Sequence, residues 1–148
     1  MSQKIDWATI GYAEILMSSS QNIPASQTTL QFSTIGSQAG SIVSSISSNK
    51  IYLAPGVYLV MCQVFFRWSS TPSSNQEIIL RLKKNNDSTL ICNSSNGGVS
   101  GIASAGSSVF GIASISSGDN IFVTIAPTSV GVAEYSLRQT RLEIIKIG

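Results

Sequence analysis

One apolar run near the middle of the chain, Val57 to Trp68, most strongly limits the fold. Its alternate positions form two sets that are both apolar: Tyr58, Val60, Cys62, Val64 and Phe66 in one, and Val57, Leu59, Met61 and Phe65 in the other. Aromatic and β-branched residues at this density predict a β-strand. One face of a sheet on a core accounts for one set only. The strand is therefore either central and covered on both faces, or its second face meets another subunit.

The rest of the chain is typical of short strands separated by turns. Further strands are expected at 7–17, 28–35, 77–84, 88–93, 107–116, 121–125 and 137–147, with one weak strand in the Ser-rich stretch 36–50. Turns are expected at Pro55-Gly56 (type II), Asn85-Asn86-Asp87, Asn96-Gly97-Gly98 and Ser117 to Asn120. This makes eight to ten strands and no helix, which predicts an all-β, antiparallel β-sandwich of the jelly-roll type. Residues 1–148 are expected to form one domain, with 1–17 as its first strand or as an N-terminal segment that reaches a partner.

Composition narrows the classes of partner. Charged residues make up 11% of the chain, against about 25% in typical soluble domains, while the apolar share is an ordinary 43%. Few charges mean weak repulsion between copies, which suits a surface covered by partners. The net charge is only +2, and Lys83-Lys84 is the single adjacent basic pair. Nucleic-acid binding is not expected, because a phosphate-binding face needs clustered cations.

The cysteines and the N-terminal residues indicate whether the chain has a metal site or a disulfide and in which compartment it is made. Cys62 and Cys92 lie in separate apolar runs, and the chain has no histidine to complete a zinc site. Two buried free thiols are expected, although the sequence leaves a disulfide open. The apolar runs are shorter than the ~20 residues that span a bilayer, and the polar start, Met1 to Asp6, is unlike a signal peptide. Synthesis in a cytoplasm and no membrane contact are therefore expected.

Catalytic chemistry has little support. Without histidine, the usual general base is missing. Spacing singles out no pair among the seven acidic residues, and Asp87 and Asp119 are more simply explained as turn formers. Gly97 to Gly101 contains a serine between glycines but precedes no helix. Asn85 to Asp87 offers oxygens to calcium without the spacing of a calcium loop. The protein is expected not to be an enzyme and to hold neither cofactor nor metal.

Two motifs in the chain point to a known family. The first is Pro55-Gly56-Val57-Tyr58-Leu59-Val60, followed by Gln63-Val64-Phe65-Phe66. The second is the Gly-Asp hairpin in Ile115 to Val123. Both resemble the family of trimeric jelly rolls that includes tumour necrosis factor and the globular head of the first complement component. Ile78 to Asn86 stands where the family has a strand that ends in a Lys-Asn turn. The resemblance extends over residues 29 to 147, without a collagen-like stalk or a cytokine-like cysteine pattern.

The resemblance implies a homotrimer with apolar and aromatic strand residues along its threefold axis. The candidates for this trimer interface are Tyr58, Phe65, Phe66 and Tyr135. The alternative is that the Val57–Trp68 strand is simply buried on both faces within one chain.

A low-charge jelly roll rich in Ser, Thr and Gly also resembles structural proteins of tailed bacteriophages. The expected function is a capsid cement or decoration protein on the virion surface that binds and stabilises the shell of the major capsid protein. Trp7, Ile10 and Tyr12 are the candidate capsid contacts. The alternative is the tip of a fibre that binds a receptor or a host-surface glycan through the loops Ser69–Asn75 and Asn93–Gly106.

Overall fold

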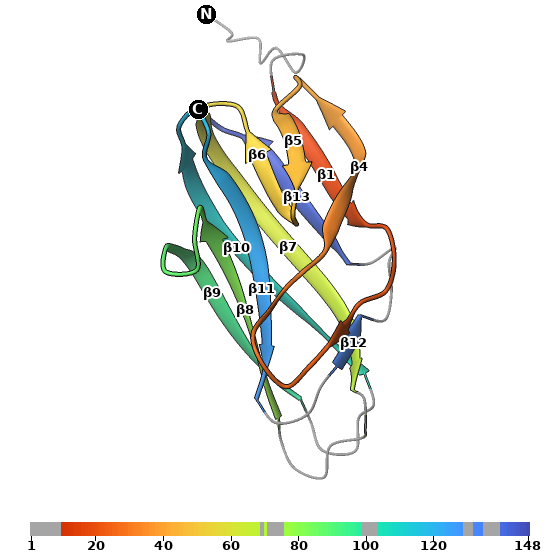
Figure 1. The fold of residues 1–148 in the computed structure, drawn as a ribbon. Coiled ribbons are helices and arrows are strands. Elements are labelled where there is room, and N and C mark those ends of the chain that lie inside the picture. Colours follow the sequence, from red (N-terminus) through yellow and green to blue (C-terminus); the bar gives the residue numbers. More distant parts are fainter. Residues whose placement is uncertain (1–9, 69, 71–75, 99–103, 129–131, 135–139) are drawn as a thin grey trace, which may run out of the picture.

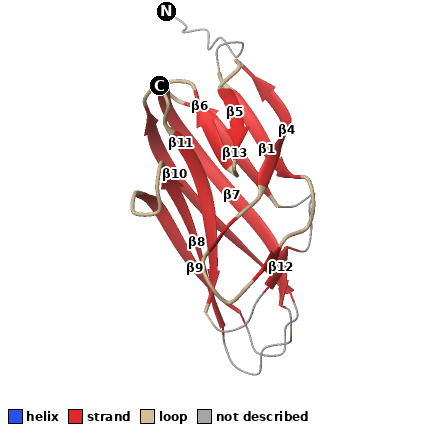
Figure 2. Cartoon of the chain, in the orientation of Figure 1, coloured by secondary structure: helices blue, strands red, loops and turns tan. Residues whose placement is uncertain are grey.

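The structure, a computed structural model, describes residues 10–68, 70, 76–98, 104–128, 132–134 and 140–148. For residues 96–98 and 132–134 it describes the backbone alone. Within these ranges every regular element is a strand, as the red arrows of Figure 2 show. The predicted all-β class is therefore confirmed.

The described residues form thirteen strands, of which ten have four or more residues, in agreement with the predicted eight to ten. The strands are β1 (Tyr12–Met17), β2 (Asn22–Ile23), β3 (Thr28–Thr29), β4 (Phe32–Ala39), β5 (Val43–Ser47), β6 (Lys50–Leu53), β7 (Gly56–Trp68), β8 (Gln76–Lys84), β9 (Leu90–Gly98), β10 (Ser104–Ile115), β11 (Asn120–Pro127), β12 (Val132–Glu134) and β13 (Arg141–Lys146).

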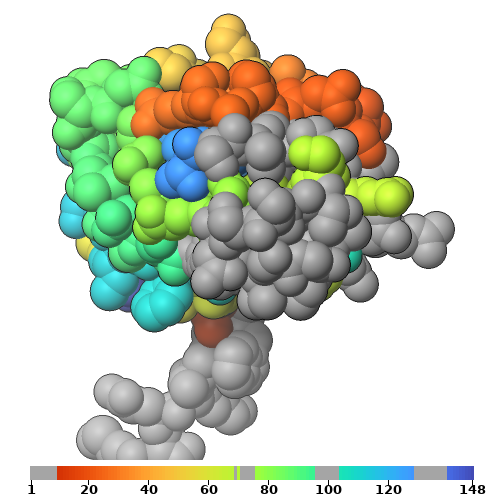
Figure 3. All heavy atoms as spheres, turned by 90° about the horizontal axis from the view of Figure 1, so that it is seen from below, coloured from red at the N-terminus to blue at the C-terminus, as the bar shows by residue number. Residues whose placement is uncertain are grey.

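Two antiparallel sheets pack against each other as a sandwich (Figure 1). Sheet A has the order β2-β12-β7-β13-β1-β4, with β10 on the other edge of β7, and sheet B has the order β5-β6-β11-β8-β9, with β3 paired to β11. β7 is central in sheet A, because it pairs with β10 on one side and with β13 and β12 on the other. Seen from below in Figure 3, the orange segment that includes β2 and β3 lies beside the green residues of β8 and β9. The predicted jelly-roll sandwich is confirmed.

The core lies between the sheets and takes one face of each long strand. In β7 this face is one of the two predicted sets, Tyr58, Val60, Cys62, Val64 and Phe66, each at most 1% exposed. Sheet B contributes the alternate residues that the sequence pattern predicts, namely Ile78, Leu80 and Leu82 of β8 and Ile121, Val123 and Ile125 of β11. Successive side chains of a strand point to opposite faces, so this pattern alone selects the core residues.

Both cysteines are free thiols. Cys62 lies in the core, where burial raises the pKa of its thiol. Cys92, on β9, is only half-buried and packs against the core from its edge. The prediction of buried free thiols is therefore confirmed for Cys62 and only in part for Cys92.

The start of β7 is held by Gly56 and Tyr58. The Tyr58 hydroxyl donates a 2.7 Å hydrogen bond to the carbonyl oxygen of Ala54, while its ring is fully buried. The Val57 N–H donates to the Gly148 carbonyl oxygen at 2.7 Å. A Cβ atom on Gly56 would lie 2.8 Å from that same oxygen, so a glycine is needed where residue 148 approaches.

These bonds replace the type II turn predicted at Pro55-Gly56. Such a turn closes when the Val57 N–H reaches the Ala54 carbonyl, and its third residue has φ near +80°. The two groups bind Gly148 and Tyr58 instead, and Gly56 has φ 156°. The chain bends at this point without forming the predicted turn.

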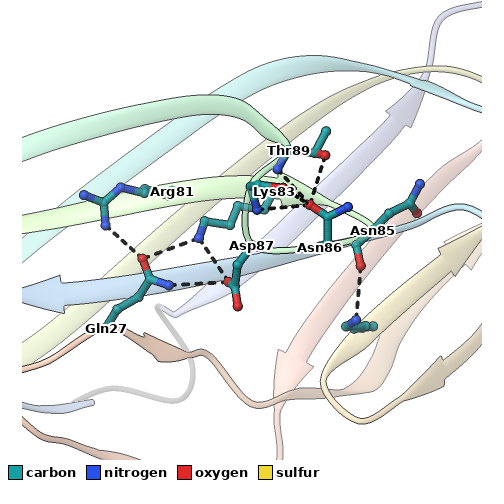
Figure 4. Close-up of polar contacts among 9 residues, drawn as sticks. Gln27, Arg81, Lys83, Asn85, Asn86, Asp87 and Thr89 are labelled. Carbon is teal, nitrogen blue, oxygen red and sulfur yellow. Dashed lines mark hydrogen bonds and ion pairs between the residues drawn. The ribbon is translucent and has the colours of Figure 1, made fainter.

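The segment between β2 and β3 is fastened to the outer surface of sheet B by Gln27 (Figure 4). The side-chain carbonyl oxygen of Gln27 accepts hydrogen bonds from Arg81 at 3.1 Å and from Lys83 at 3.4 Å, and its amide donates to Asp87 at 3.4 Å. The Lys83 ammonium also lies 3.0 Å from Asp87. Lys83 is only 4% exposed, so this part of sheet B is both polar and covered.

Two further predictions about strands are wrong. Asn96-Gly97-Gly98 does not turn, because β9 continues through Gly98 in register with β8. The Ser-rich stretch 36–50 contains the end of β4, all of β5 and the start of β6 rather than one weak strand. Strands with exposed, polar side chains keep their backbone pairing but lack the apolar alternation that reveals a strand.

The Tyr58 hydroxyl gives a direct test of how β7 is anchored. Tyr58→Phe removes the only donor of the bond to Ala54, so we expect a loss of about 1–2 kcal/mol in the free energy of unfolding. Urea denaturation followed by tryptophan fluorescence measures this loss. Tyr52→Phe, at a half-buried position on β6 of sheet B, is the control. Equal stabilities of the two variants would contradict the anchoring role.

Candidate functional site

The outer surface of sheet A, which faces away from the core, carries a continuous apolar patch. Register places Ile112 of β10 opposite Leu59 of β7, and Leu59 opposite Ile145 of β13. One step along, Phe110 of β10 lies opposite Met61 of β7. These five residues, Phe110, Ile112, Leu59, Met61 and Ile145, are called the apolar face below. Directly opposite side chains on one face of a sheet are in contact range, so the patch is contiguous.

Phe110 and Ile112 make the apolar face unusual for a surface. Phe110 is 68% exposed and Ile112 is 62% exposed. The positions on either side of this pair, Val109 and Ala113, point into the core and are buried. Scattered apolar residues on a surface are normal, whereas two large ones side by side, continued on neighbouring strands, indicate an interaction site.

A shallow hollow of about 210 Å³ lies beside the Phe110 ring. Its walls include Met61, Gln63, Ser108, Phe110, Arg141 and Glu143. The hollow thus borders the apolar face on one side and charged side chains of β13 on the other. A protruding ring next to a half-open hollow provides the relief that a packed contact between two surfaces needs.

A charged group adjoins the apolar face on β13 and β1. The Arg141 guanidinium lies 3.2 Å from the Glu143 carboxylate and 4.0 Å from the Glu14 carboxylate. All three side chains are partly exposed, so the ion pairs themselves add little to stability. They nonetheless set the charge of the surface around the hollow.

The trimer-interface candidates from sequence fall in three different places. Tyr58 and Phe66 are core residues, 0% and 1% exposed, so their assignment to an interface is corrected: the jelly roll itself uses that face of β7. Phe65 points outward, is half-buried and lies against Gly106 of β10. Tyr135 lies outside the described residues.

The capsid-contact candidates lie at the N-terminal side of sheet A. Trp7 is outside the described residues. Ile10 and Tyr12 are half-buried, and Tyr12 pairs with Ile145, which puts its side chain at the border of the apolar face. Of the two candidate glycan-binding loops, Ser69–Asn75 lies outside the described residues except for Ser70. In the other, Asn93–Gly98 belongs to β9 and Ser104–Gly106 to β10 rather than to a loop.

Sequence reasoning missed Phe110 and Ile112 as site residues. The pattern that could have revealed them is present in the strand predicted at 107–116. Val109 and Ile115 occupy one parity, Phe110 and Ile112 the other, so this strand is apolar on both faces, as the Val57–Trp68 strand is. Two neighbouring strands with doubly apolar patterns are a signal for an additional covered surface.

Most carboxylates in the described ranges have structural partners. Asp119 ends the tight turn between β10 and β11, where its carboxylate accepts the Ser116 N–H at 2.9 Å. It also lies 2.7 Å from the Lys84 ammonium and accepts the Asn85 side-chain amide at 2.7 Å. Asn86 caps the other hairpin by accepting the Thr89 N–H at 3.0 Å, as Figure 4 shows. The predicted turns at Asn85–Asp87 and Ser117–Asn120 are confirmed.

The bonds to Lys84, Ser116 and Asn85 lower the pKa of Asp119 to about 2. They do so because each of them favours the ionised carboxylate. Within the described ranges no cluster of three metal-binding side chains occurs.

The low pKa of Asp119 predicts a pH-dependent contribution to stability. Because the folded chain favours the carboxylate, the contribution is complete above the unfolded-state pKa near 3.9 and is lost as pH falls towards 2. Asp119→Asn should therefore lower the melting temperature at pH 7, and the difference from the unmodified protein should shrink between pH 4 and pH 2. Circular dichroism melts measure it, with Glu77→Gln as control. A deficit that is equal at pH 7 and pH 2 would count against this network.

Comparison with solved structures identifies the fold. Crystal structures of murine APRIL at pH 5.0, pH 8.5 and pH 8.0 superpose with TM-scores of 0.69, 0.65 and 0.64. The sequence identities are 14%, 15% and 14%, and each alignment covers 93% of this chain and 99% of the APRIL chain. The fold is the tumour-necrosis-factor-like jelly roll. At these identities the likeness concerns the fold alone.

Comparison by sequence finds no related protein. No family model matches the chain, and no curated protein matches it. In the part of the chain that the structure describes, no helix is long and apolar enough to cross a membrane.

Proposed function

We propose that this protein is a non-enzymatic structural module that associates with copies of itself through the apolar face. The observation that carries the proposal is the adjacency of Phe110 and Ile112, exposed on one strand and continued by Leu59 and Met61. Covering the exposed part of these two side chains contributes about 1–2 kcal/mol each. In a symmetric ring every copy makes the same contact, so each interface adds the same favourable free energy and the ring as a whole is stable.

A second copy is the occupant that the surface supports best. The apolar face contains no charged member, and the whole chain has few charges, so little repulsion opposes contact between copies. The ring of Phe110 and the hollow beside it lie on the same surface, which allows one copy to supply the protrusion and the next to receive it. The family resemblance of the two sequence motifs favours three copies.

Within this class we propose the role expected from sequence, a bacteriophage capsid decoration protein that braces the major capsid protein on the virion surface. The low-charge, Ser-, Thr- and Gly-rich composition supports it. Three equivalent copies on one assembly would bind symmetric capsid sites at once and gain avidity. Tyr12 borders the apolar face, so we assign it to contact between copies and leave Trp7 and Ile10 as capsid-contact candidates.

Self-association is tested by mass in solution. Light scattering behind a sizing column should give a mass near three times 15.6 kDa for the unmodified protein. The double variant Phe110→Ser, Ile112→Ser should give 15.6 kDa. Ile35→Ser, which alters a 37% exposed residue on β4 at the opposite edge of sheet A, should keep the larger mass. A monomeric unmodified protein would refute the proposed interface.

The capsid role needs a separate experiment. Purified capsids incubated with the protein should bind it at a fixed number of sites and withstand higher temperature before releasing DNA. Binding to cells or glycan arrays, with no effect on capsids, would refute decoration and favour the fibre-tip alternative.

A further inference from the structure

Two carboxylates face each other beside the apolar face. Glu14 of β1 and Glu143 of β13 are directly opposite in the antiparallel register. Side chains in such a position have Cβ atoms about 4.5–5.5 Å apart, and like charges there are unfavourable. Glu143 in turn lies opposite Met61, and Met61 opposite Phe110, so the carboxylates continue one row of the apolar face.

Arg141 is the positively charged side chain that lies next to both carboxylates. It lies 3.2 Å from Glu143 and 4.0 Å from Glu14, so one guanidinium balances two carboxylates. Tyr12 lies two residues from Glu14 on the same face of β1 and brings no cation to the pair.

The neighbouring strands add no second cation at this position. β7 places Met61 and Gln63 beside the row, and its outward cation, Arg67, lies four residues beyond Gln63. β4 and β10 contain no charged residue. Lys146 of β13 reaches towards Gly56 instead. Among the residues that the structure describes, the row therefore carries one excess negative charge per copy.

We propose that self-association through the apolar face takes up a proton at the Glu14–Glu143 pair, so that mildly acid pH strengthens the assembly. This inference rests on the proposed interface. When a second copy covers the row, both carboxylates lose water while only one guanidinium remains to balance them. Removal from water penalises an unbalanced charge and favours the neutral carboxylic acid.

The direction of the pH effect follows from proton linkage. The assembled state binds more protons than the separate copies, so association strengthens as pH falls and weakens as pH rises. One proton taken up per copy changes the association constant by up to about tenfold per pH unit for each copy. Because every copy in a ring takes up one proton, the association constant of the whole ring depends steeply on pH.

The composition makes the effect easy to assign. The chain has no histidine, the side chain that normally titrates between pH 5 and 8. Asp119, with a pKa of about 2, stays ionised throughout this range. A pH-dependent assembly between pH 8 and pH 5 therefore indicates either the α-amino group, which titrates near pH 8, or a carboxyl group in an altered environment such as the interface, and Glu14→Gln distinguishes the two.

The experiment is a dilution series analysed by sedimentation velocity at pH 8, 7, 6 and 5 and constant ionic strength. For the unmodified protein we expect the dissociation midpoint to fall at least tenfold from pH 8 to pH 5. Glu14→Gln leaves the 3.2 Å Arg141–Glu143 pair balanced, so its assembly should be tighter at pH 8 and nearly independent of pH. Glu77→Gln, on β8 of sheet B, should behave like the unmodified protein.

The outcomes separate this inference from the proposed function. Assembly with the same midpoint at every pH, or a Glu14→Gln variant that keeps the full pH dependence, would overturn the proton-uptake proposal and leave the interface standing. A chain that is monomeric at every pH would overturn the interface itself. Circular dichroism melts of each variant, together with Glu143→Gln as a second variant, ensure that a lost assembly is not an unfolded chain.

Discussion

The packing of the inward side chains of β7 against sheet B is the interaction on which both sheets depend. β7 pairs with β10 on one edge and with β13 and β12 on the other, so its position sets theirs. Tyr58 fixes the start of the strand through the Ala54 carbonyl, and the ring itself fills part of the core. Because this face is committed to the core, only the opposite face of β7 remains for contact with another molecule. The outward side chains of β7, Leu59 and Met61, therefore belong to the apolar face.

The core was predictable from the sequence because its signal is local. Alternation along β8 and β11 identifies Leu80 and Ile125 without knowledge of their partners. The Asp119–Asn85 contact joins residues 34 positions apart and depends on the register between β8 and β11, which no local pattern encodes. The same limit explains the site. Phe110 and Ile112 show a doubly apolar strand, but only the pairing with β7 joins them to Leu59 and Met61 as one surface.

A surface through which copies associate needs both attraction and selectivity, and a charged row beside an apolar face can supply both. Apolar area supplies the attraction, yet a chain that exposes it also risks unspecific contact with other chains. Charged groups at the border favour partners that align with them and disfavour those that do not. In this chain Glu14, Glu143 and Arg141 take that place, within a sequence that has few charges elsewhere. The position of these charges therefore matters more than their number.

The place of β13 between β1 and β7 has a consequence for how the chain folds. β1 (Tyr12–Met17) can pair with β4 early, but its other edge stays open until residues 141–146 have been synthesised. The same late strand closes one edge of β7. On the ribosome, sheet A therefore remains split into two pieces for most of translation, with unpaired edges in both. Such long-range closure predicts slow folding after release, and a chain shortened before residue 141 would lose the middle of the sheet rather than one of its ends.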